Sequence, residues 1–437
     1  MDGDGLDAGG GFAALLRRLA APGRDAARRF QLAAVALGLL CFFDGLANSM
    51  VVGRVSRDLA DRAGVARVKL AYIADSTSSA VACVALISTW IAFQLTMIGE
   101  AFSLAGRDAN PYLVFLRSLP HNYYCWFTLV LLFVAVRHSC NLGPMRDFVR
   151  EARERAGAEV EIHDDPSYGS PVTVLAPLAV LIFAFFALFL VLGGEGPLLP
   201  LTREKIVAAF GSDAGPVVLI LAAVVATLAA VAMYPRATRG GWSAAGRAFG
   251  GGVWSMVRPI FILVAAWMLG SVLGDLGTAD LIAGLATGSG SLPWLPTMVF
   301  LTGAIVSFST GTSWGTMGLL FPLAVPAAAS LGADDPFLHI VVAAVFSGAV
   351  FGDHCSPFSD TTIVTSISCG VEPHDHVRTQ IPYALVTALV AVGLGFLPAG
   401  YGLPGWISLS VGAAFLLMLP RLLGLGRFPE DVTTMDD

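Results

Sequence analysis

Residues 281–333 read LIAGLATGSGSLPWLPTMVFLTGAIVSFSTGTSWGTMGLLFPLAVPAAASLGA, a run of 53 residues without Asp, Glu, Lys or Arg. A helix needs about 20 apolar residues to cross the hydrocarbon core of a bilayer. The run therefore predicts two membrane crossings, or one crossing and a re-entrant hairpin. Such continuous runs indicate helices, because the strands of a membrane barrel alternate apolar and polar residues.

The rest of the chain shares this apolar character. Of its 437 residues, 56% are hydrophobic and 13% are charged, whereas about 25% are charged in a typical soluble domain. Further uncharged stretches are Ser76–Gly99, Ser118–Val136, Pro166–Gly194, Ala214–Pro235 and Thr379–Pro420. We therefore predict an all-α polytopic membrane protein with about eight to ten membrane segments, including re-entrant or broken helices.

Charged segments divide the sequence into two hydrophobic lobes. The expected divisions are 1–29, a basic cytoplasmic lead-in; 30–136, a first transport lobe; 137–165, a charged cytoplasmic loop; 166–253, linking membrane helices; 254–424, a second transport lobe; and 425–437, a polar tail. The arginines of 1–29 and 137–165 place both on the cytoplasmic side. The basic stretch Arg54–Lys69 joins them there if Gln31–Gly53 enters the membrane and returns. We expect a multi-pass protein of the cell membrane, the inner membrane of a bacterium.

Two carboxylates interrupt an apolar segment of the second lobe. Asp353 follows 17 residues without Asp, Glu, Lys or Arg, and Asp360 lies seven positions later. An ionised carboxylate at the bilayer centre costs about 2.5–3.5 kcal/mol on insertion scales, so such residues usually have a function. The hydroxyls of Ser356, Ser359 and Thr361 accompany them. Carboxylates and hydroxyls are hard oxygen ligands, so this stretch predicts a cation or proton site.

Polar residues in three other apolar segments are further candidates for the same site. They are Asp44, Asn48, Asp75, Ser76 and Thr77 in the first lobe, and Thr312 and Ser313 in the long uncharged run. The alternative is structural: hydroxyls bond backbone carbonyls or neighbouring helices, and the two acids cap a helix or pair with Arg or Lys.

A short repeat relates the two lobes. Each has an Asp followed after 23 or 25 residues by Arg, and five residues later by Tyr: Asp44, Arg67 and Tyr72, then Asp353, Arg378 and Tyr383. Secondary transporters are often built from repeats whose broken helices meet at a site near the midplane. We expect a shared ion site, with Arg378 compensating the charge of a carboxylate when the site is empty.

A rival function comes from GTSWG at residues 311–315, which fits the G-x-S-x-G nucleophile signature of hydrolases. An intramembrane serine protease would need His339 or His354 as the base for Ser313. The pattern arises easily in a chain with 48 glycines, and no other protease element follows. We do not expect an enzyme.

Metal and cofactor sites have little support in the sequence. The six cysteines form no CxxC pair and are expected to be small buried hydrophobic residues. His354 with Cys355 is a conceivable metal pair, and so is the run of His374, Asp375 and His376. We expect that run in a surface loop or a pH-responsive cluster outside the membrane. No cofactor is expected.

Four segments resemble the signature segments of the NhaC family of sodium/proton antiporters, in the ion transporter superfamily. They are FFDGLANSMVVG at 42–53, KLAYIADSTSSAVACVALISTWIAF at 69–93, GTSWGTMGLLFPLAVPAA at 311–328 and SGAVFGDHCSPFSDTTIVTSISCGVEPHDHVRTQIPYAL at 347–385. The resemblance implies an all-helical fold with inverted repeats and hairpins, and exchange of sodium for protons. Some members of the family instead exchange organic acids or move amino acids.

Two departures from the family pattern concern the first lobe. Family members commonly have paired acids where Gly45 follows Asp44 here, which weakens that position as an ion ligand. They also carry several hydrophobic segments before this motif, whereas 43 residues precede Asp44 in this chain. A shortened paralogue, a mis-started gene model and half of a split system are the interpretations left open.

The sequence thus predicts a secondary active transporter, a sodium/proton antiporter that works by alternating access. Sodium and a proton would compete for Asp353 and Asp360. The alternative is a sodium- or proton-coupled carrier of organic acids or amino acids, with Arg378 binding the solute carboxylate. The expected partners are sodium and the proton, or a small organic acid, and the lipid bilayer; nucleic acid is not expected, and a homodimer is left open.

Overall fold

The computed structural model describes residues 14–16, 26–156, 171–194, 214–237, 241–255 and 292–423, with single positions between 202 and 276. Every regular element with printed bounds in these residues is a helix, which confirms the all-α prediction. The helices before residue 256 are α2 (Ala26–Leu40), α3 (Gly45–Arg62), α4 (Arg67–Val84), α5 (Thr89–Leu104), α6 (Pro111–Ser118), η2 (Leu119–His121), α7 (Tyr123–Arg137), α8 (Met145–Ala156), α9 (Val172–Leu192), α11 (Gly215–Ala237) and α12 (Gly241–Ser255). Those after residue 291 are η3 (Leu292–Trp294), α15 (Leu295–Thr310), α16 (Ser313–Ser330), α17 (Asp335–Cys355), α18 (Asp360–Cys369), α19 (Pro373–Val390), η4 (Ala391–Phe396), α20 (Leu397–Gly400) and α21 (Gly405–Leu422).

Several of these helices are long and apolar enough to cross a membrane. Five spans meet that description within the described residues, or up to seven if each of two bent helix pairs is one span. The bent pairs are α4 with α5, at 45°, and α6 and η2 with α7, at 48°. The chain is therefore a multi-pass membrane protein with broken helices. Because the count covers the described residues only, it does not test the expected total of eight to ten.

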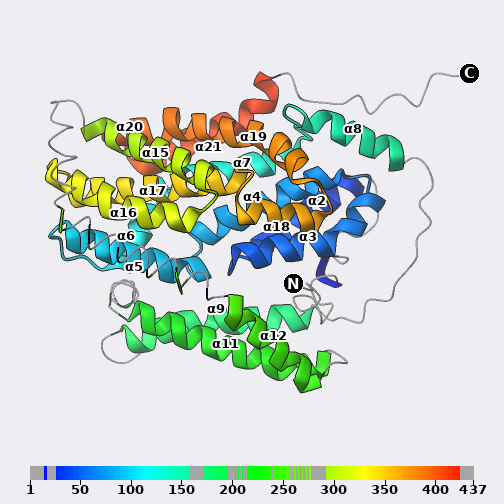
Figure 1. Ribbon diagram of the computed structural model, residues 1–437, viewed down its shortest axis with the longest axis horizontal. Coiled ribbons are helices and arrows are strands. Elements are labelled where there is room, and N and C mark those ends of the chain that lie inside the picture. The colour runs from blue at the N-terminus through cyan, green and yellow to red at the C-terminus, as the bar shows by residue number, and fades with distance from the viewer. Residues whose placement is uncertain are drawn as a thin grey trace, which may run out of the picture.

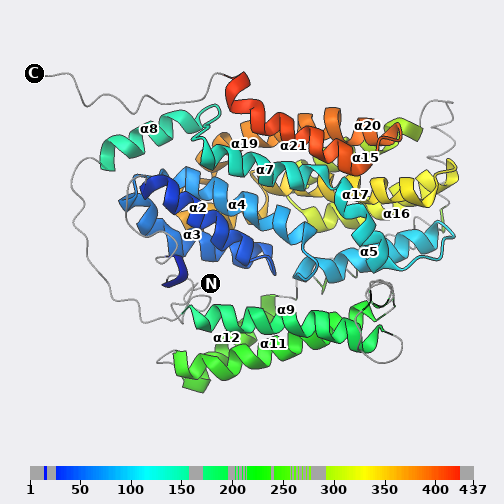
Figure 2. The ribbon, with the colours of Figure 1, turned by 180° about the vertical axis from the view of Figure 1, so that it is seen from behind.

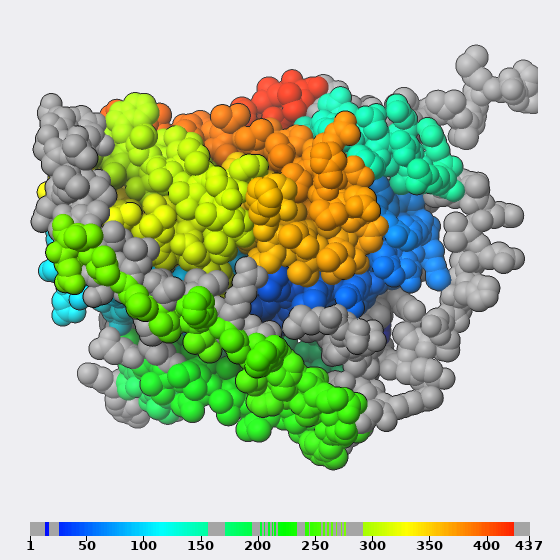
Figure 3. All heavy atoms as spheres, in the orientation of Figure 1, coloured from blue at the N-terminus to red at the C-terminus, as the bar shows by residue number. Residues whose placement is uncertain are grey.

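Helices α9, α11 and α12 form a layer beside the other helices (Figures 1 and 2). Helix α9 has a mean hydropathy of 2.9 over its apolar window, of which 17% is buried. Side chains such as Phe183, 76% exposed, point away from the protein, and Figure 3 shows the outer surface of α11 and α12 along this side. A helix that faces lipid exposes apolar side chains in this way. The layer touches the other helices at Tyr112 of α6, whose ring lies 5.2 Å from that of Phe189 of α9.

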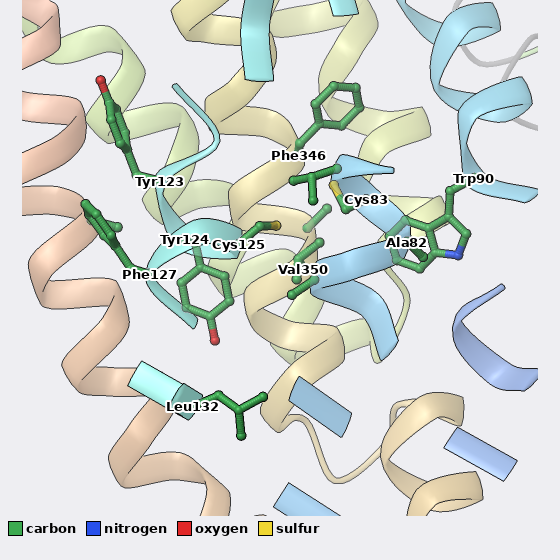
Figure 4. Packing of buried hydrophobic residues seen from close by; sticks show 14 of the residues in the cluster. Ala82, Cys83, Trp90, Tyr123, Tyr124, Cys125, Phe127, Leu132, Phe346 and Val350 are labelled. Atoms are coloured by element: carbon green, nitrogen blue, oxygen red, sulfur yellow. The ribbon is translucent and has the colours of Figure 1, made fainter. Parts of the chain in front are cut away.

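The other helices enclose α4. Every residue of α4 from Val68 to Val84 is buried, and the helix packs against α2, α3, α7, α17, α18 and α19. Aromatic and aliphatic side chains fill the adjoining space; Figure 4 shows Cys83 of α4 near Cys125 of α7 and Phe346 and Val350 of α17. Polar side chains on an enclosed helix must find hydrogen-bond partners inside the protein, because water is excluded.

Candidate ion-binding site

The helix that carries Asp353 breaks directly after this residue. Helix α17 ends at Cys355 and α18 begins at Asp360. Pro357 disfavours a helical conformation at the residue before it, and Ser356 is indeed extended, with φ −76° and ψ 134°. The break brings the carboxylate of Asp353 beside the first turn of α18, where unpaired backbone N–H groups favour negative charge.

Two serines donate to the Asp353 carboxylate, which is 1% exposed. Ser359, the residue before α18, donates to Oδ1 at 2.8 Å. Ser79 of α4 donates to Oδ2 from the other lobe of the protein. Both serines are fully buried. The carboxylate therefore links the two lobes through hydroxyls and has no Lys or Arg salt-bridge partner among the described residues.

Further oxygens surround the same residue. The Thr361 and Thr362 hydroxyls donate to the backbone carbonyl of Asp353 at 2.9 and 3.2 Å. The hydroxyl oxygens of Ser359 and Thr361 are 2.7 Å apart. Asp360 is half-buried and is the first residue of α18. Carboxylate, hydroxyl and carbonyl oxygens at such close spacing form a hard-oxygen donor set of the kind that alkali cations take.

The polar run DSTSS, residues 75–79, connects α4 to three neighbouring helices. Successive residues on a helix point about 100° apart, so four side chains of the run reach partners on other helices, whereas Ser78 donates to the carbonyl of Asp75 in its own helix. Thr77 lies beside Asn48 of α3, whose Nδ2 donates to the carbonyl of Thr77 at 2.8 Å. Ser76 and Ser79 contact two adjacent residues of α17, His354 and Asp353, and Asp75 contacts α19.

Asp75 forms a buried pair with His376 of α19. The Asp75 Oδ2 and His376 Nε2 atoms are 3.0 Å apart, and both side chains are 0% exposed. The expectation that residues 374–376 form a surface loop is wrong for His376, which lies in the first turn of α19. His374 is exposed. The structural alternative for Asp75 was a buried pair with Arg or Lys. The structure pairs this carboxylate with a histidine instead.

A second histidine, His354, follows Asp353 on α17 and is held on both ring nitrogens. Its Nε2 lies 2.9 Å from the Ser76 hydroxyl, and its Nδ1 lies 2.8 Å from the Tyr124 hydroxyl. Figure 4 shows the hydroxyls of Tyr123 and Tyr124 pointing in opposite directions. Because both nitrogens of His354 are engaged, this residue is not a free base for Ser313.

The break between α17 and α18 packs on the break between α15 and α16. Ser356 donates to the carbonyl of Phe308 at 2.6 Å, so its hydroxyl serves this junction and not the carboxylate. Gly311 ends α15 in a left-handed conformation, with φ 66°, and a Cβ there would collide with the backbone of Phe358. Thr312 caps α16 by accepting from the N–H of Gly315 at 3.2 Å. Ser313 follows as the first residue of α16.

The first lobe has an equivalent junction around Asp44. Asp44 is the N-cap of α3: its Oδ1 accepts from the N–H of Ala47 at 2.7 Å. Its Oδ2 accepts from the Thr89 hydroxyl at 2.7 Å, at the start of α5. The N–H of Thr89 in turn donates to the carbonyl of Phe43 at 2.8 Å. Asp44 is half-buried. It caps a helix, as the structural alternative for this residue had it.

The repeated tyrosines meet, whereas the repeated arginines do not reach the site. The rings of Tyr72 and Tyr383 lie 4.2 Å apart. Arg67 bonds Asp61 at 2.6 Å near the surface. Arg378 is exposed, because it lies two residues after His376 and hence on the opposite side of α19. The structure does not bring Arg378 to Asp353 or Asp75.

Three residues of the site were not expected to lie near Asp353. Ser79 and Tyr124 come from helices far from Asp353 in the chain, and His376 was considered only as part of the run 374–376. One signal was available: Asp75 and Ser79 are four residues apart, which places them on neighbouring positions of one helix face. The candidate metal pairs are not joined by further ligands, since the described residues contain no group of three His, Cys, Asp or Glu that could hold a metal.

Comparison with known proteins identifies the family. The sequence profile described as "Na+/H+ antiporter family" matches residues 81–398. The chain belongs to the Na+/H+ antiporter family. The match includes Asp353, Asp360 and His376, whereas Asp44 and Asp75 precede it.

Three relatives of this antiporter chain extend the comparison. An uncharacterised protein of Haemophilus influenzae is 30% identical over 405 residues, which are 90% of this chain and 75% of the relative. The Na(+)/H(+) antiporter NhaC of Alkalihalophilus pseudofirmus is 30% identical over 225 residues, 47% of each chain. The Malate-2H(+)/Na(+)-lactate antiporter of Bacillus subtilis is 34% identical over 142 residues, 32% of this chain and 28% of the relative.

A solved structure shares the fold of this antiporter. The YdaH transporter of Alcanivorax borkumensis, described as having an unusual topology, superimposes with a TM-score of 0.63. The likeness covers 92% of this chain and 84% of the YdaH chain at 16% sequence identity. At this identity the likeness shows the fold alone.

Proposed function

We propose that this member of the family exchanges sodium for protons at Asp353. The observation that carries the proposal is the arrangement around this carboxylate: it is buried, receives a hydroxyl from each lobe, and has carbonyl and hydroxyl oxygens beside it. Sodium and a proton both bind carboxylate oxygens, so one displaces the other. Loading the site with one of them at a time couples their movements.

The two lobes supply different parts of the proposed sodium site. Asp353, Ser359 and Thr361 come from the α17–α18 break, and Ser79 comes from α4. Asp360 adds negative charge at the edge of the site. A relative movement of α4 and the α17–α18 break would separate Ser79 from Asp353, which is a physical route to alternating access.

Asp75, Ser76 and His354 form the polar surroundings of this site. Asp75 is held by His376, and Ser76 is held by His354. These contacts fix the orientation of α4 against α17 and α19, so that Ser79 points at Asp353. We assign Asp44, Asn48 and Thr312 to the helix junctions, where their bonds stabilise the breaks.

Vesicles containing the full chain test the proposed exchange. A pH-sensitive dye is enclosed, and a pulse of sodium chloride is added outside. Entry of sodium in exchange for protons raises the internal pH, and the rate saturates with sodium concentration. An equal response to choline chloride, or to vesicles without protein, would contradict the proposal.

An organic-acid carrier is the second candidate function. The relative named for malate, sodium and lactate supports it, and so does Lys69, a buried basic residue of α4. Uptake of radiolabelled malate and lactate by the same vesicles distinguishes the two functions, because a sodium/proton exchanger without an organic substrate accumulates neither.

A further inference from the structure

Lys69 is a buried amine that has no carboxylate partner among the described residues. Lys69 and Lys205 are the two lysines of the chain. Lys69 is 2% exposed, and its Nζ atom has no hydrogen-bond partner among the described residues. A buried charge is costly unless it is paired and hydrogen-bonded. Packing alone therefore does not explain why the Lys69 side chain is buried.

Two tyrosine rings form one side of the Lys69 environment. Nζ lies 5.0 Å from the centroid of Tyr72 and 5.3 Å from that of Tyr383. Cation–π contacts of this kind offset only part of the loss of hydration of an ammonium group. They leave its three N–H donors free, since an aromatic face attracts the charge without accepting along each N–H bond.

Gln380 is a second buried polar group, on the same helix as Tyr383. It is 0% exposed, and neither its Oε1 nor its Nε2 has a partner in the described part of the chain. Gln380 precedes Tyr383 by three residues, a spacing that makes the two neighbours on one face of α19. In the repeat of the two lobes, Gln380 occupies the position of Lys69, because RVKLAY aligns with RTQIPY.

The surrounding loop adds positive charge. The Tyr383 hydroxyl accepts from the N–H of Leu142 at 2.9 Å and donates to the carbonyl of Cys140 at 3.3 Å. Arg146 donates to the carbonyl of Asn141 at 2.9 Å. The loop between α7 and α8 thus contacts Tyr383, and Arg146 at the start of α8 bonds the same loop. Lys69, Gln380 and Arg146 together favour an anion.

We propose that Lys69 and Gln380 bind the carboxylate of a small organic anion between α4 and α19. The ammonium group pairs with the charge, and the Gln380 amide donates to a carboxylate oxygen or bonds a neighbouring hydroxyl of the solute. The inference rests on the proposed transport function, and it names the residues that an organic solute would use. It assigns the solute to α4, which also carries Ser79 of the sodium site.

Thermal unfolding of the purified full chain in detergent tests this binding without any ion gradient. Acetate, lactate and malate are titrated as choline salts, with choline chloride at equal ionic strength as the reference. At least one of the three carboxylates is expected to raise the unfolding temperature saturably above chloride. The absence of such a rise for all three would overturn the proposal.

Substitutions then locate the site. Lys69→Met is expected to weaken the apparent affinity by about tenfold or more, the loss expected for a charge-assisted hydrogen bond. Lys69→Arg keeps most of the affinity because it keeps the charge, and Lys205→Gln is the control that leaves affinity unchanged. If Lys69→Met does not fold, Gln380→Leu decides, with an expected weakening of about threefold or more. If Lys69→Met folds and binds the carboxylate as tightly as the wild type, the proposal is overturned. If Lys69→Met does not fold, wild-type affinity in Gln380→Leu overturns it.

The result is separable from that of the proposed sodium exchange. Carboxylate binding is read from unfolding temperatures in choline salts, whereas sodium exchange is read from internal pH in chloride medium. Failure of the first with success of the second removes Lys69 from solute recognition and leaves Asp353 in place. The opposite pattern retains the anion site and removes the sodium mechanism.

Discussion

Asp44 and Asp353 occupy the helix breaks of the two lobes, and their environments differ. Asp44 is half-buried and bonds the N–H of Ala47 and the Thr89 hydroxyl, which is the pattern of a helix cap. Asp353 is buried and receives hydroxyls from α4 and from the start of α18. A carboxylate at a helix break is therefore not by itself evidence of an ion site. Burial and hydroxyls from both lobes distinguish Asp353, the proposed ion site, from the capping Asp44.

The largest expected effect concerns the contact that fixes α4 against the second lobe. His376→Leu leaves Asp75 buried without its partner, which is expected to destabilise the protein by about 3–5 kcal/mol. Thermal unfolding in detergent measures the loss. The double variant Asp75→Asn with His376→Leu recovers much of it, because no charge then remains buried.

His374→Leu is the matched control for that comparison. His374 lies in the same turn of α19 but is exposed, so its loss should change the unfolding temperature little. If His374→Leu and His376→Leu unfold at the same temperature, the Asp75–His376 pair does not hold α4 in place.

The next effect tests the difference between the two helix breaks. Asp353 receives a hydroxyl from Ser79 of the opposite lobe, whereas Asp44 receives one from Thr89 of its own lobe. Ser79→Ala is expected to raise the sodium concentration at half-maximal exchange by about 10–100-fold, as losses of groups that orient an ion ligand do. Vesicle assays over a range of sodium concentrations measure this shift.

Ser88→Ala is the control for a serine at a helix start. Ser88 caps α5 by accepting from the N–H of Ile91 at 3.2 Å and has no part in the proposed sodium site. Its sodium dependence should match that of the wild type. A shift as large as that of Ser79→Ala would show that loss of packing, and not loss of an oxygen donor, governs the apparent affinity.

The smallest expected effect is at the first-lobe break. Asp44→Ala removes the cap of α3 and is expected to lower the free energy of unfolding by about 0.5–2 kcal/mol. Asp44→Ser keeps a capping oxygen and should recover most of that loss. Equal stability of Asp44→Ala and the wild type in chemical or thermal unfolding would break the assignment of Asp44 as a cap.

The sequence predicts the helices well because the bilayer leaves few choices. Long uncharged runs must bond their own backbone groups, and helices do so within each segment. Asp353, Ser359 and Thr361 were also visible, because they lie within eight residues of one another on either side of a break. Local chemistry of this kind can be inferred without the tertiary packing.

The remaining partners depend on packing between distant segments. Ser79 and Asp353 are 274 residues apart in the chain, and Asp75 and His376 are 301 apart. The repeat pointed to Arg378 as the group opposite a carboxylate, but the face of α19 turned toward α4 carries His376 and Gln380. A rotation of two residues along a helix changes which side chain enters the interior, and residue identity alone does not fix that rotation.

The central claim is that the second-lobe carboxylate binds the exchanged ions, whereas its first-lobe counterpart caps a helix. The most direct test measures sodium-driven alkalinisation in vesicles containing Asp353→Asn or Asp44→Asn, with equal amounts of folded protein. Asp353→Asn is expected to fall to the rate of protein-free vesicles, and Asp44→Asn is expected to keep sodium-dependent exchange. Wild-type exchange by Asp353→Asn would contradict the central claim.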